Sequence, residues 1–190
     1  FPGGGVDARD MPGDVDGDGT ASPEIGWKGP STEWWADRLR TSPDIARALV
    51  CAAVRETFEE TGTLLAGHRD GRTVQDTTGY LPFRAELENH RLAFTDFMEQ
   101  HDLELRGDLL RPWANWVTPE GQPIRYNTAF FVASMPEGQA AYGDTREATS
   151  TGWFRPGTLL DGWRNRKINL MPPTWSQLKM LDTFRSVEEV

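Results

Sequence analysis

The segment from Ser42 to Gly62 constrains this chain most, because it reads as a single helix with clear start and stop signals. Ser42 is a favoured N-cap residue, and Pro43 and Asp44 suit the first helical turn. Gly62 is a natural residue to end a helix, because glycine readily adopts the left-handed backbone conformation found there. The sequence therefore predicts a helix over residues 43–61.

Three glutamates lie close together near the end of this helix, at positions 56, 59 and 60. At 100° per residue they share an arc of roughly 100°. Earlier in the helix the same arc is apolar and contains Ile45, Ala48, Leu49 and Ala52. The opposite face is apolar as well and carries Val50, Cys51, Val54 and Phe58. A helix with two apolar faces is buried between layers, so we expect the glutamates to point into the protein.

The repulsion between the charges of these carboxylates must be offset by a favourable interaction. Like charges three or four residues apart on a helix destabilise it by roughly 0.2–0.5 kcal/mol per pair, and buried charges need partners. Arg55 can reach Glu59 one turn further on, but a single arginine cannot neutralise three acids. A purely structural ion-pair cluster is the alternative. Because Mg²⁺ prefers oxygen ligands and is often bound together with substrate phosphates, we predict that Glu56, Glu59 and Glu60 bind a divalent cation.

The overall composition limits the classes of partner. The chain has 190 residues, enough for one sizeable domain, and a formal net charge of −9, which argues against a nucleic-acid-binding surface. No apolar run is long enough to span a membrane. The single Cys51 excludes an internal disulfide and favours a reducing, cytoplasmic location. The chain opens on FPGGG without methionine, which leaves room for an upstream segment.

The rest of the chain mixes helical and strand patterns. Helices are expected over residues 31–39, from 81 to about 101, after Pro156, and over 174–187; strands are expected within 109–119, 124–135 and 150–154. This mixed order predicts an α/β or α+β sandwich. The first 31 residues read as loop. Their DVDGDG run resembles the start of a calcium-binding loop. Counting from Asp14, however, the twelfth position is Ile25, where such a loop needs a glutamate. A plain acidic loop is therefore favoured over calcium binding at Asp14, Asp16 and Asp18.

Residues 55–62, RETFEETG, resemble the second half of the Nudix box, R-E-U-x-E-E-x-G. Residues 1–4, FPGG, resemble the opening of the same family's motif, and Asp10 stands where the box has its first glutamate. Between Asp10 and Arg55 lie 44 residues, where the family usually has seven. The box therefore resembles one that is split by an insertion over residues 11–41.

The split box and later segments are similar to one Nudix branch, that of the peroxisomal coenzyme A diphosphatase. WANWVTP, RYNTAFFVASMP and the late PPT carry this likeness, with departures at Asn127 and Ala129, where an acid and a base are expected. The resemblance implies a single Nudix domain over residues 1–190, folded as an α/β/α sandwich with a mixed sheet. It also implies a second insertion, helical, over residues 81–101. The first strands of the fold are expected upstream of this chain.

The resemblance implies a Mg²⁺- or Mn²⁺-dependent hydrolase that cleaves the diphosphate bond of a nucleoside diphosphate linked to another group. Coenzyme A or acyl-CoA is the favoured substrate. ADP-ribose, NADH and dinucleoside polyphosphates are alternatives, as is a Nudix-fold binding module without turnover. Arg55 is expected to orient Glu59. The expected partner is the small-molecule substrate, and no binding to nucleic acid or membrane is expected. A homodimer through the Trp27–Trp35 segment is a further expectation.

The remaining site residues follow from the same resemblance. Glu147 is the first candidate for the general base, and Glu120 the second. Gly3 and Gly4 are expected to let the backbone approach the metals and phosphates, because glycine permits close contact. Substrate binding is also predicted for Arg125 and Tyr126. The aromatic rings of Trp116, Tyr126 and Phe130 could stack on a base, although strand aromatics more often pack in the core.

Overall fold

The computed structural model describes residues 3–7, 10, 25–142 and 152–190. The chain forms two compact units. The larger unit contains residues 2–115 and 129–149, and the smaller unit contains residues 116–128 and 150–190. Glu56, Glu59 and Glu60 belong to the larger unit.

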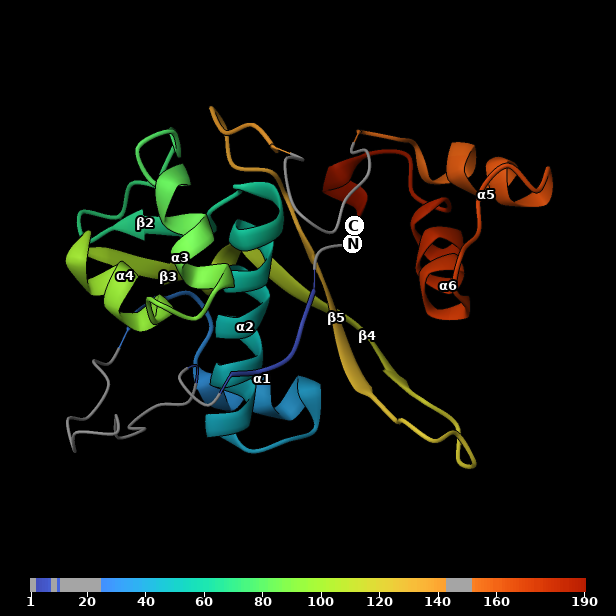
Figure 1. Cartoon of the computed structure of the whole chain (residues 1–190), viewed down its shortest axis with the longest axis horizontal. Helices are drawn as coiled ribbons and strands as arrows, with labels where there is room; N and C mark the ends of the chain where they lie inside the picture. The colour runs from blue at the N-terminus through green and yellow to red at the C-terminus, as the bar shows by residue number, and fades with distance from the viewer. Residues whose placement is uncertain (1–2, 8–9, 11–24, 143–151) are drawn as a thin grey trace. The chain divides into compact units, whose positions relative to one another are not determined.

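Helix α2 (Pro43–Thr61) forms the centre of the larger unit and begins and ends as the sequence predicts (Figure 1). The Ser42 side chain accepts a hydrogen bond from the Ile45 backbone N–H, and Gly62 closes the helix with φ 70°. Both faces are buried, with Ile45 as an exposed exception. Helix α1 (Thr32–Leu39) packs against α2 and places Trp35 entirely inside the core.

A short mixed sheet lies in the same unit. Strands β1 (Gly26–Lys28), β3 (Leu103–Arg106) and β2 (Ala66–His68) are ordered β1-β3-β2. β1 runs parallel to β3, and β2 runs antiparallel to it. The mixed sheet and the helices agree with the predicted fold class. The core that joins them consists of buried side chains from both helices and strands, chiefly Trp35, Val50, Val54, Phe58, Leu64, Leu65, Leu87, Phe94, Phe97, Met98, Leu103 and Leu105.

The single helix predicted from residue 81 to about 101 is wrong. The chain instead forms a 3₁₀ turn η2 (Leu81–Phe83), helix α3 (Arg84–Glu88) and helix α4 (Phe94–Gln100). His90 adopts a left-handed conformation with φ 55°, which ends α3 and turns the chain. Leu87, Phe94 and Phe97 are buried on both sides of this break. The apolar spacing therefore continues through the turn, which is why the pattern indicates one helix.

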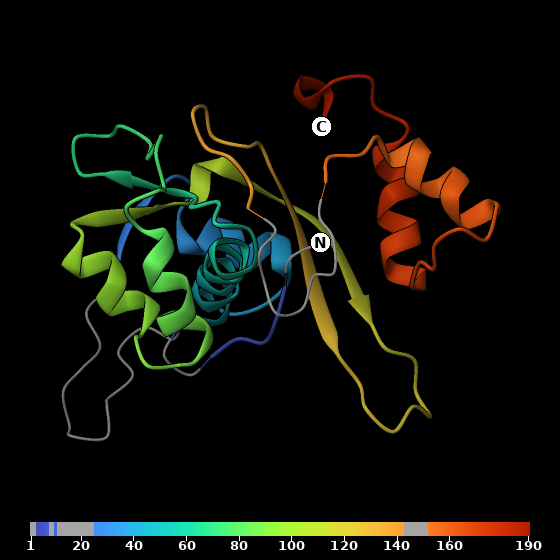
Figure 2. The same ribbon diagram turned by 45° about the horizontal axis from the view of Figure 1, so that its top comes forward.

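Strands β4 (Leu110–Val117) and β5 (Asn127–Ala133) pair with each other and follow the 3₁₀ turn η3 (Gly107–Leu109). β4 confirms the strand predicted within 109–119, whereas β5 is shorter than the predicted 124–135. Figure 2 shows the two strands as a long ribbon joined by a turn.

The smaller unit contains helix α5 (Pro156–Arg164), helix α6 (Pro172–Leu181) and a 3₁₀ turn η4 (Val187–Glu189). The helix predicted after Pro156 is confirmed; the terminal helix starts two residues before its predicted start and stops six residues before its predicted end. The strand predicted over 150–154 is absent from its described part, because residues 152–155 pair with no strand. Among the described helices, none is both long enough and apolar enough to cross a membrane.

Candidate functional site

Arg55 is the centre of a buried ion-pair network on α2. Its Nε lies 3.1 Å from Oδ1 of Asp10, and its Nη2 lies 3.0 Å from Oδ2, so the two groups form a bidentate pair. Nη2 also donates to the Gly5 carbonyl oxygen at 2.9 Å. Both side chains are almost fully buried, at 8% and 2% exposure. The pair joins two parts of the chain that are 45 residues apart in sequence.

The same guanidinium faces the glutamates. Arg55 Nη1 donates to Oε1 of Glu56 at 2.8 Å and to the carboxylate of Glu59 at 3.2 and 3.4 Å. Glu60 accepts a hydrogen bond from the Gly3 backbone N–H at 2.9 Å. The three glutamates therefore lie together at the end of a helix buried on both sides. Among the described residues, one guanidinium contacts three of the four carboxylates, so their formal charges sum to a negative value.

The burial of this network alters its titration. Burial raises the pKa of Glu59 to about 6, and the positive charge of Arg55 opposes that rise. Burial also works against the charge of Arg55, but the hydrogen bonds and charge of Asp10 keep the Arg55 pKa above its usual value. Burial, followed by the charge of Asp10, raises the pKa of the Cys51 thiol well above its usual value. A neutral thiol can therefore donate to Asp10 Oδ1, 3.7 Å away.

A cavity of about 430 Å³ opens beside these carboxylates, and its wall includes the glycine-rich segment 3–5. Gly4 lies directly against the Glu56 carboxylate: a Cβ atom at this position would be 2.5 Å from the Glu56 Cδ atom. A side chain at this position would force the Glu56 carboxylate to move, which agrees with the close approach predicted for this glycine. The cavity is lined by Gly3, Gly4, Gly5, Val6, Asp7, Arg55, Glu56, Glu59, Glu60, Glu88 and His90.

The donor set suits an open divalent-cation site. Within the described residues, no three histidine, cysteine or acidic side chains are arranged as a cage that could hold a metal ion. Arg55 instead engages oxygens of Glu56 and Glu59. Mg²⁺ seldom uses such cages; it keeps several waters and is held by one or two carboxylates together with substrate phosphates. The excess of carboxylates over cationic side chains among the described residues of the cavity wall fits a cation held in this way.

Comparison with known proteins decides the family. Residues 29–181 match the family model described as the NUDT19 Nudix domain. The chain belongs to the NUDT19 Nudix domain family. Its relatives include the acyl-coenzyme A diphosphatase NUDT19 of Xenopus laevis, 30% identical over 74% of this chain and 40% of that protein. The human protein of the same name is 27% identical over 81% of this chain and 44% of its own length. The chain thus spans about two fifths of the curated relatives that it matches.

A solved structure supports the Nudix fold. The crystal structure of a NUDIX hydrolase from Alicyclobacillus acidocaldarius aligns with a TM-score of 0.69 and 25% identity, and the match covers 85% of this chain and 75% of that one. The resemblance read from residues 55–62 is therefore confirmed at the level of family and fold. The NUDT19 Nudix domain match does not include the glycine-rich segment or Asp10, which precede residue 29.

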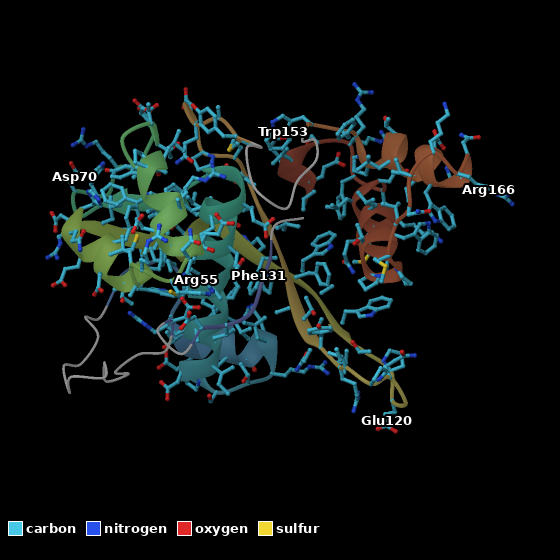
Figure 3. All side chains as sticks on the ribbon, viewed as in Figure 1. Arg55, Asp70, Glu120, Phe131, Trp153 and Arg166 are labelled. Atoms are coloured by element: carbon cyan, nitrogen blue, oxygen red, sulfur yellow. The ribbon has the colours of Figure 1, made fainter. Side chains whose placement is uncertain are left out.

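The structure brings some of the predicted site residues together and leaves others apart. Arg55, the three glutamates, Gly3 and Gly4 line one cavity. Arg125 and Tyr126 belong to the smaller unit and are exposed, where Arg125 donates to the Thr118 carbonyl oxygen. Figure 3 shows Arg55 on α2 and Glu120 at the turn between β4 and β5. Glu147 and the DVDGDG run lie outside the described residues.

The aromatic predictions have mixed outcomes. Trp35 is fully buried in the core of its own chain and makes an edge contact with Trp34, so it is not available as a contact between two copies. Trp116 and Phe130 are half-buried, and Tyr126 is 64% exposed. The expectation that strand aromatics pack in the core is therefore wrong for Tyr126. Stacking of any of these rings on a base stays a prediction, as does a homodimer.

Four residues near the site were not predicted from the sequence. Asp7, Glu88 and His90 line the cavity. Arg84 donates two hydrogen bonds, at 3.0 and 2.8 Å, to the Glu59 backbone carbonyl, where the end of α2 lacks intrahelical donors. The only signal for the turn that exposes His90 is the Asn89-His90 pair, since both residue types tolerate the left-handed conformation better than most.

Proposed function

We propose that this chain is the Nudix domain of a hydrolase that cleaves the diphosphate bond of a nucleoside diphosphate linked to another group. Coenzyme A and acyl-CoA are the favoured substrates, because the relatives described above carry the name acyl-coenzyme A diphosphatase. The cofactor is Mg²⁺ or Mn²⁺. Family membership supports the reaction class, and the carboxylate cavity supports the cation.

The observation that carries the proposal is the excess of carboxylate over cationic charge at the wall of the cavity. Among the described lining residues, Glu56 and Glu59 contact one guanidinium, which is already held by Asp10, and Glu60 accepts from the Gly3 backbone N–H. A diphosphate carries concentrated negative charge and would be repelled from this surface without a counter-ion. The site is therefore suited to a diphosphate that arrives with a divalent cation.

Each side chain has a role that follows from its contacts. Glu56, Glu59 and Glu60 would hold the cation, which when bound supplies charge neutralisation and a more acidic bound water. Arg55 orients Glu59 through its Nη1, and Asp10 fixes Arg55 from the other side. The Gly3 N–H donates to Glu60 and Gly4 lies against the Glu56 carboxylate, so the backbone of this segment would lie beside the bound cation and the phosphates.

The general base is assigned to Glu147, with Glu120 as the second candidate. Support comes from the described residues on the N-terminal side of Glu147. The Tyr142 backbone N–H donates to the Thr61 carbonyl oxygen at 2.6 Å, so the chain passes the end of α2 five residues before Glu147. Gln139 holds the same segment by pairing with both backbone groups of Leu64. Glu120 belongs to the exposed turn of the other unit.

A binding module without turnover is the second candidate. It would keep the cavity but lack a reactive metal arrangement. The intact set of three glutamates favours an enzyme, since loss of turnover is readily achieved by loss of one ligand. Other Nudix substrates, namely ADP-ribose, NADH and dinucleoside polyphosphates, stay open because pocket loops and not the fold determine substrate choice.

A substrate panel tests the proposal. The protein is incubated with Mg²⁺ or Mn²⁺ and each of coenzyme A, acyl-CoA, ADP-ribose, NADH and dinucleoside polyphosphates, and the products are identified by mass. We expect cleavage of the diphosphate bond of coenzyme A or acyl-CoA, and its loss on addition of EDTA. Binding of nucleotides without any cleavage would favour the binding module. Cleavage that is unaffected by EDTA would contradict the cation assignment.

A further inference from the structure

Glu59 is held at its backbone as well as at its side chain. Arg84, the first residue of α3, donates from Nε and Nη2 to the Glu59 carbonyl oxygen at 3.0 and 2.8 Å. At the other end of the same residue, Arg55 Nη1 lies 3.2 and 3.4 Å from the two carboxylate oxygens of Glu59. Two arginines from different helices therefore fix one glutamate of the cavity wall. Among the described residues, those that line the cavity include Arg55 but not Arg84.

The Glu59 carbonyl needs such a donor because it lies in the last turn of α2. The last four carbonyl groups of a helix have no donor within the helix. The N–H that lies four residues after Glu59 is that of Thr63, and it donates to the Thr61 side-chain oxygen at 3.2 Å. The guanidinium of Arg84 binds the carbonyl instead, at the helix end where the dipole favours a cation. Without Arg84, the turn that carries Glu59 would lose both hydrogen bonds and would fray more readily.

The residue before Arg84 is packed back onto α2. The ring centroid of Phe83 lies 5.7 Å from that of Phe97 on α4. Phe97 in turn stacks on Phe58 of α2, with the ring centroids 5.4 Å apart, and both of these side chains are fully buried. Because Phe58 directly precedes Glu59 in the chain, the start of α3 and the end of α2 are joined by core packing as well as by the Arg84 hydrogen bonds.

We propose that Arg84 is a positioning residue that fixes the backbone of Glu59 and so holds the Glu59 carboxylate in place for the cation. The inference rests on the proposed function, in which Glu59 is one of the ligands. Removal of an outer partner that orients a metal ligand typically lowers metal affinity or activity by about 10–100-fold. Helix α3 would thus contribute to the site without contacting the cation or the substrate.

Binding of Mn²⁺ alone tests the proposal without any substrate. Arg84→Met keeps the length of the apolar stem and removes both donors, so we expect about tenfold weaker binding of Mn²⁺, followed by the electron paramagnetic resonance signal of the free ion. Arg84→Lys keeps a cation and one donor and should lie between Arg84→Met and wild type. Arg111→Met is the matched control. Arg111 also donates two hydrogen bonds to main-chain carbonyl oxygens, those of Asp108 and Leu110, each at 2.8 Å, but it belongs to β4. We expect Arg111→Met to bind Mn²⁺ as wild type does.

A double variant distinguishes positioning of Glu59 from a general effect on the fold. If Arg84 acts through Glu59, Arg84→Met should weaken Mn²⁺ binding in the wild-type background and have no further effect in protein that carries Glu59→Gln. All variants are compared well below their melting temperatures, so that each is folded. An equal loss in both backgrounds would overturn the proposal, as would unchanged Mn²⁺ affinity in Arg84→Met.

Turnover separates this inference from the proposed function. With the diphosphate substrate and saturating Mg²⁺, we expect Arg84→Met to lower kcat about tenfold while KM changes far less. Weaker Mn²⁺ binding by Arg84→Met, with no turnover by wild type, would keep the role of Arg84 and reject the hydrolase. Turnover by wild type with equal kinetic constants and equal Mn²⁺ binding in Arg84→Met would reject the role of Arg84 alone. Neither Mn²⁺ binding nor turnover by wild type would reject both.

Discussion

At the scale of single residues, Arg55 explains how several carboxylates can share one small volume. It contacts Asp10, Glu56 and Glu59 at the same time, and burial keeps these contacts away from water. Buried charges that are paired and hydrogen-bonded are tolerated, whereas an unpaired one is costly. The network therefore holds Glu59 in place, and its described carboxylates outnumber the one guanidinium that they contact.

The first prediction concerns the glutamates themselves. Glu59→Gln and Glu60→Gln keep the shape of the side chain and remove its charge, so we expect turnover to be abolished while the far-UV circular dichroism spectrum is unchanged. Glu86→Gln is the matched control, because Glu86 lies on α3 and pairs with Arg91 at the surface. Wild-type rates in the Glu59 and Glu60 variants would refute the assignment of these residues.

The second prediction concerns Asp10. Asp10→Asn keeps the side-chain shape but removes the charge that faces Arg55, so we expect a loss of about 3 kcal/mol in the free energy of unfolding, typical of a broken buried pair. Urea denaturation followed by tryptophan fluorescence measures it. The control is Asp70→Asn, which removes an exposed pair with Arg72 and should not change the midpoint measurably. Equal midpoints for both variants would contradict the assigned importance of the Asp10–Arg55 pair.

At the scale of secondary-structure elements, the end of α2 determines where Glu59 and Glu60 lie. Gly62 ends the helix with φ 70°, and a Cβ atom there would be 2.8 Å from Leu81 Cδ2. Arg84 binds the Glu59 carbonyl oxygen from α3. The glutamates are thus held by contacts to the residues around the helix end as well as by the helix itself.

The third prediction follows from this helix end. Gly62→Ala forces a Cβ into the left-handed region, which costs roughly 1–2 kcal/mol, and adds the contact with Leu81. We expect a lower melting temperature and lower activity, because the last turn carries the glutamates. Gly79→Ala is the control, since a Cβ at that position meets no neighbouring atom. Equal melting temperatures for the two variants would contradict the role of Gly62.

The fourth prediction concerns the end of strand β3, where Arg106 pairs with Asp108 at 2.7 Å. Hydrogen bonds from Arg106 lower the pKa of Asp108 from its usual 3.8. The unfolded chain therefore binds the proton more tightly, so this contribution to stability is present above pH 3.8 and is lost as the pH falls below it. Urea unfolding across this pH range should show wild type converging on Asp108→Asn. A constant difference between the two proteins would contradict the shift.

The sequence predicts these elements unevenly, for physical reasons. The ends of α2 are predictable because Ser42, Pro43 and Gly62 act locally, and the inward direction of the glutamates follows from helical periodicity. The turn at His90 is hard to predict, because the spacing of the buried residues Leu87, Phe94 and Phe97 suits one continuous helix and hides the break. The contact of His90 with Asp7 depends on folding across 83 residues of sequence and has no local signal.

At the scale of the whole molecule, the negative charge limits the stability of the folded chain, and its response to a cation can be measured. The chain carries a net charge of −9, and part of that excess gathers at the cavity wall beside Arg55. Bringing carboxylates together destabilises the folded state unless a cation joins them. Family membership and site geometry therefore lead to one measurable consequence that does not depend on knowing the substrate.

The fifth prediction is that Mg²⁺ or Mn²⁺ raises the melting temperature of the wild-type protein without any nucleotide. A ligand at ten times its Kd stabilises the folded state by about 1.4 kcal/mol, which corresponds to a shift of roughly 3–5 °C for a chain of this size. Glu59→Gln should show a smaller shift because it removes a ligand, whereas Glu86→Gln should respond as wild type does. NaCl at the same ionic strength separates binding from general screening of the negative charge. An equal shift in wild type and in Glu56→Gln, Glu59→Gln and Glu60→Gln would mean that the cation binds elsewhere, and the glutamates would then require another explanation.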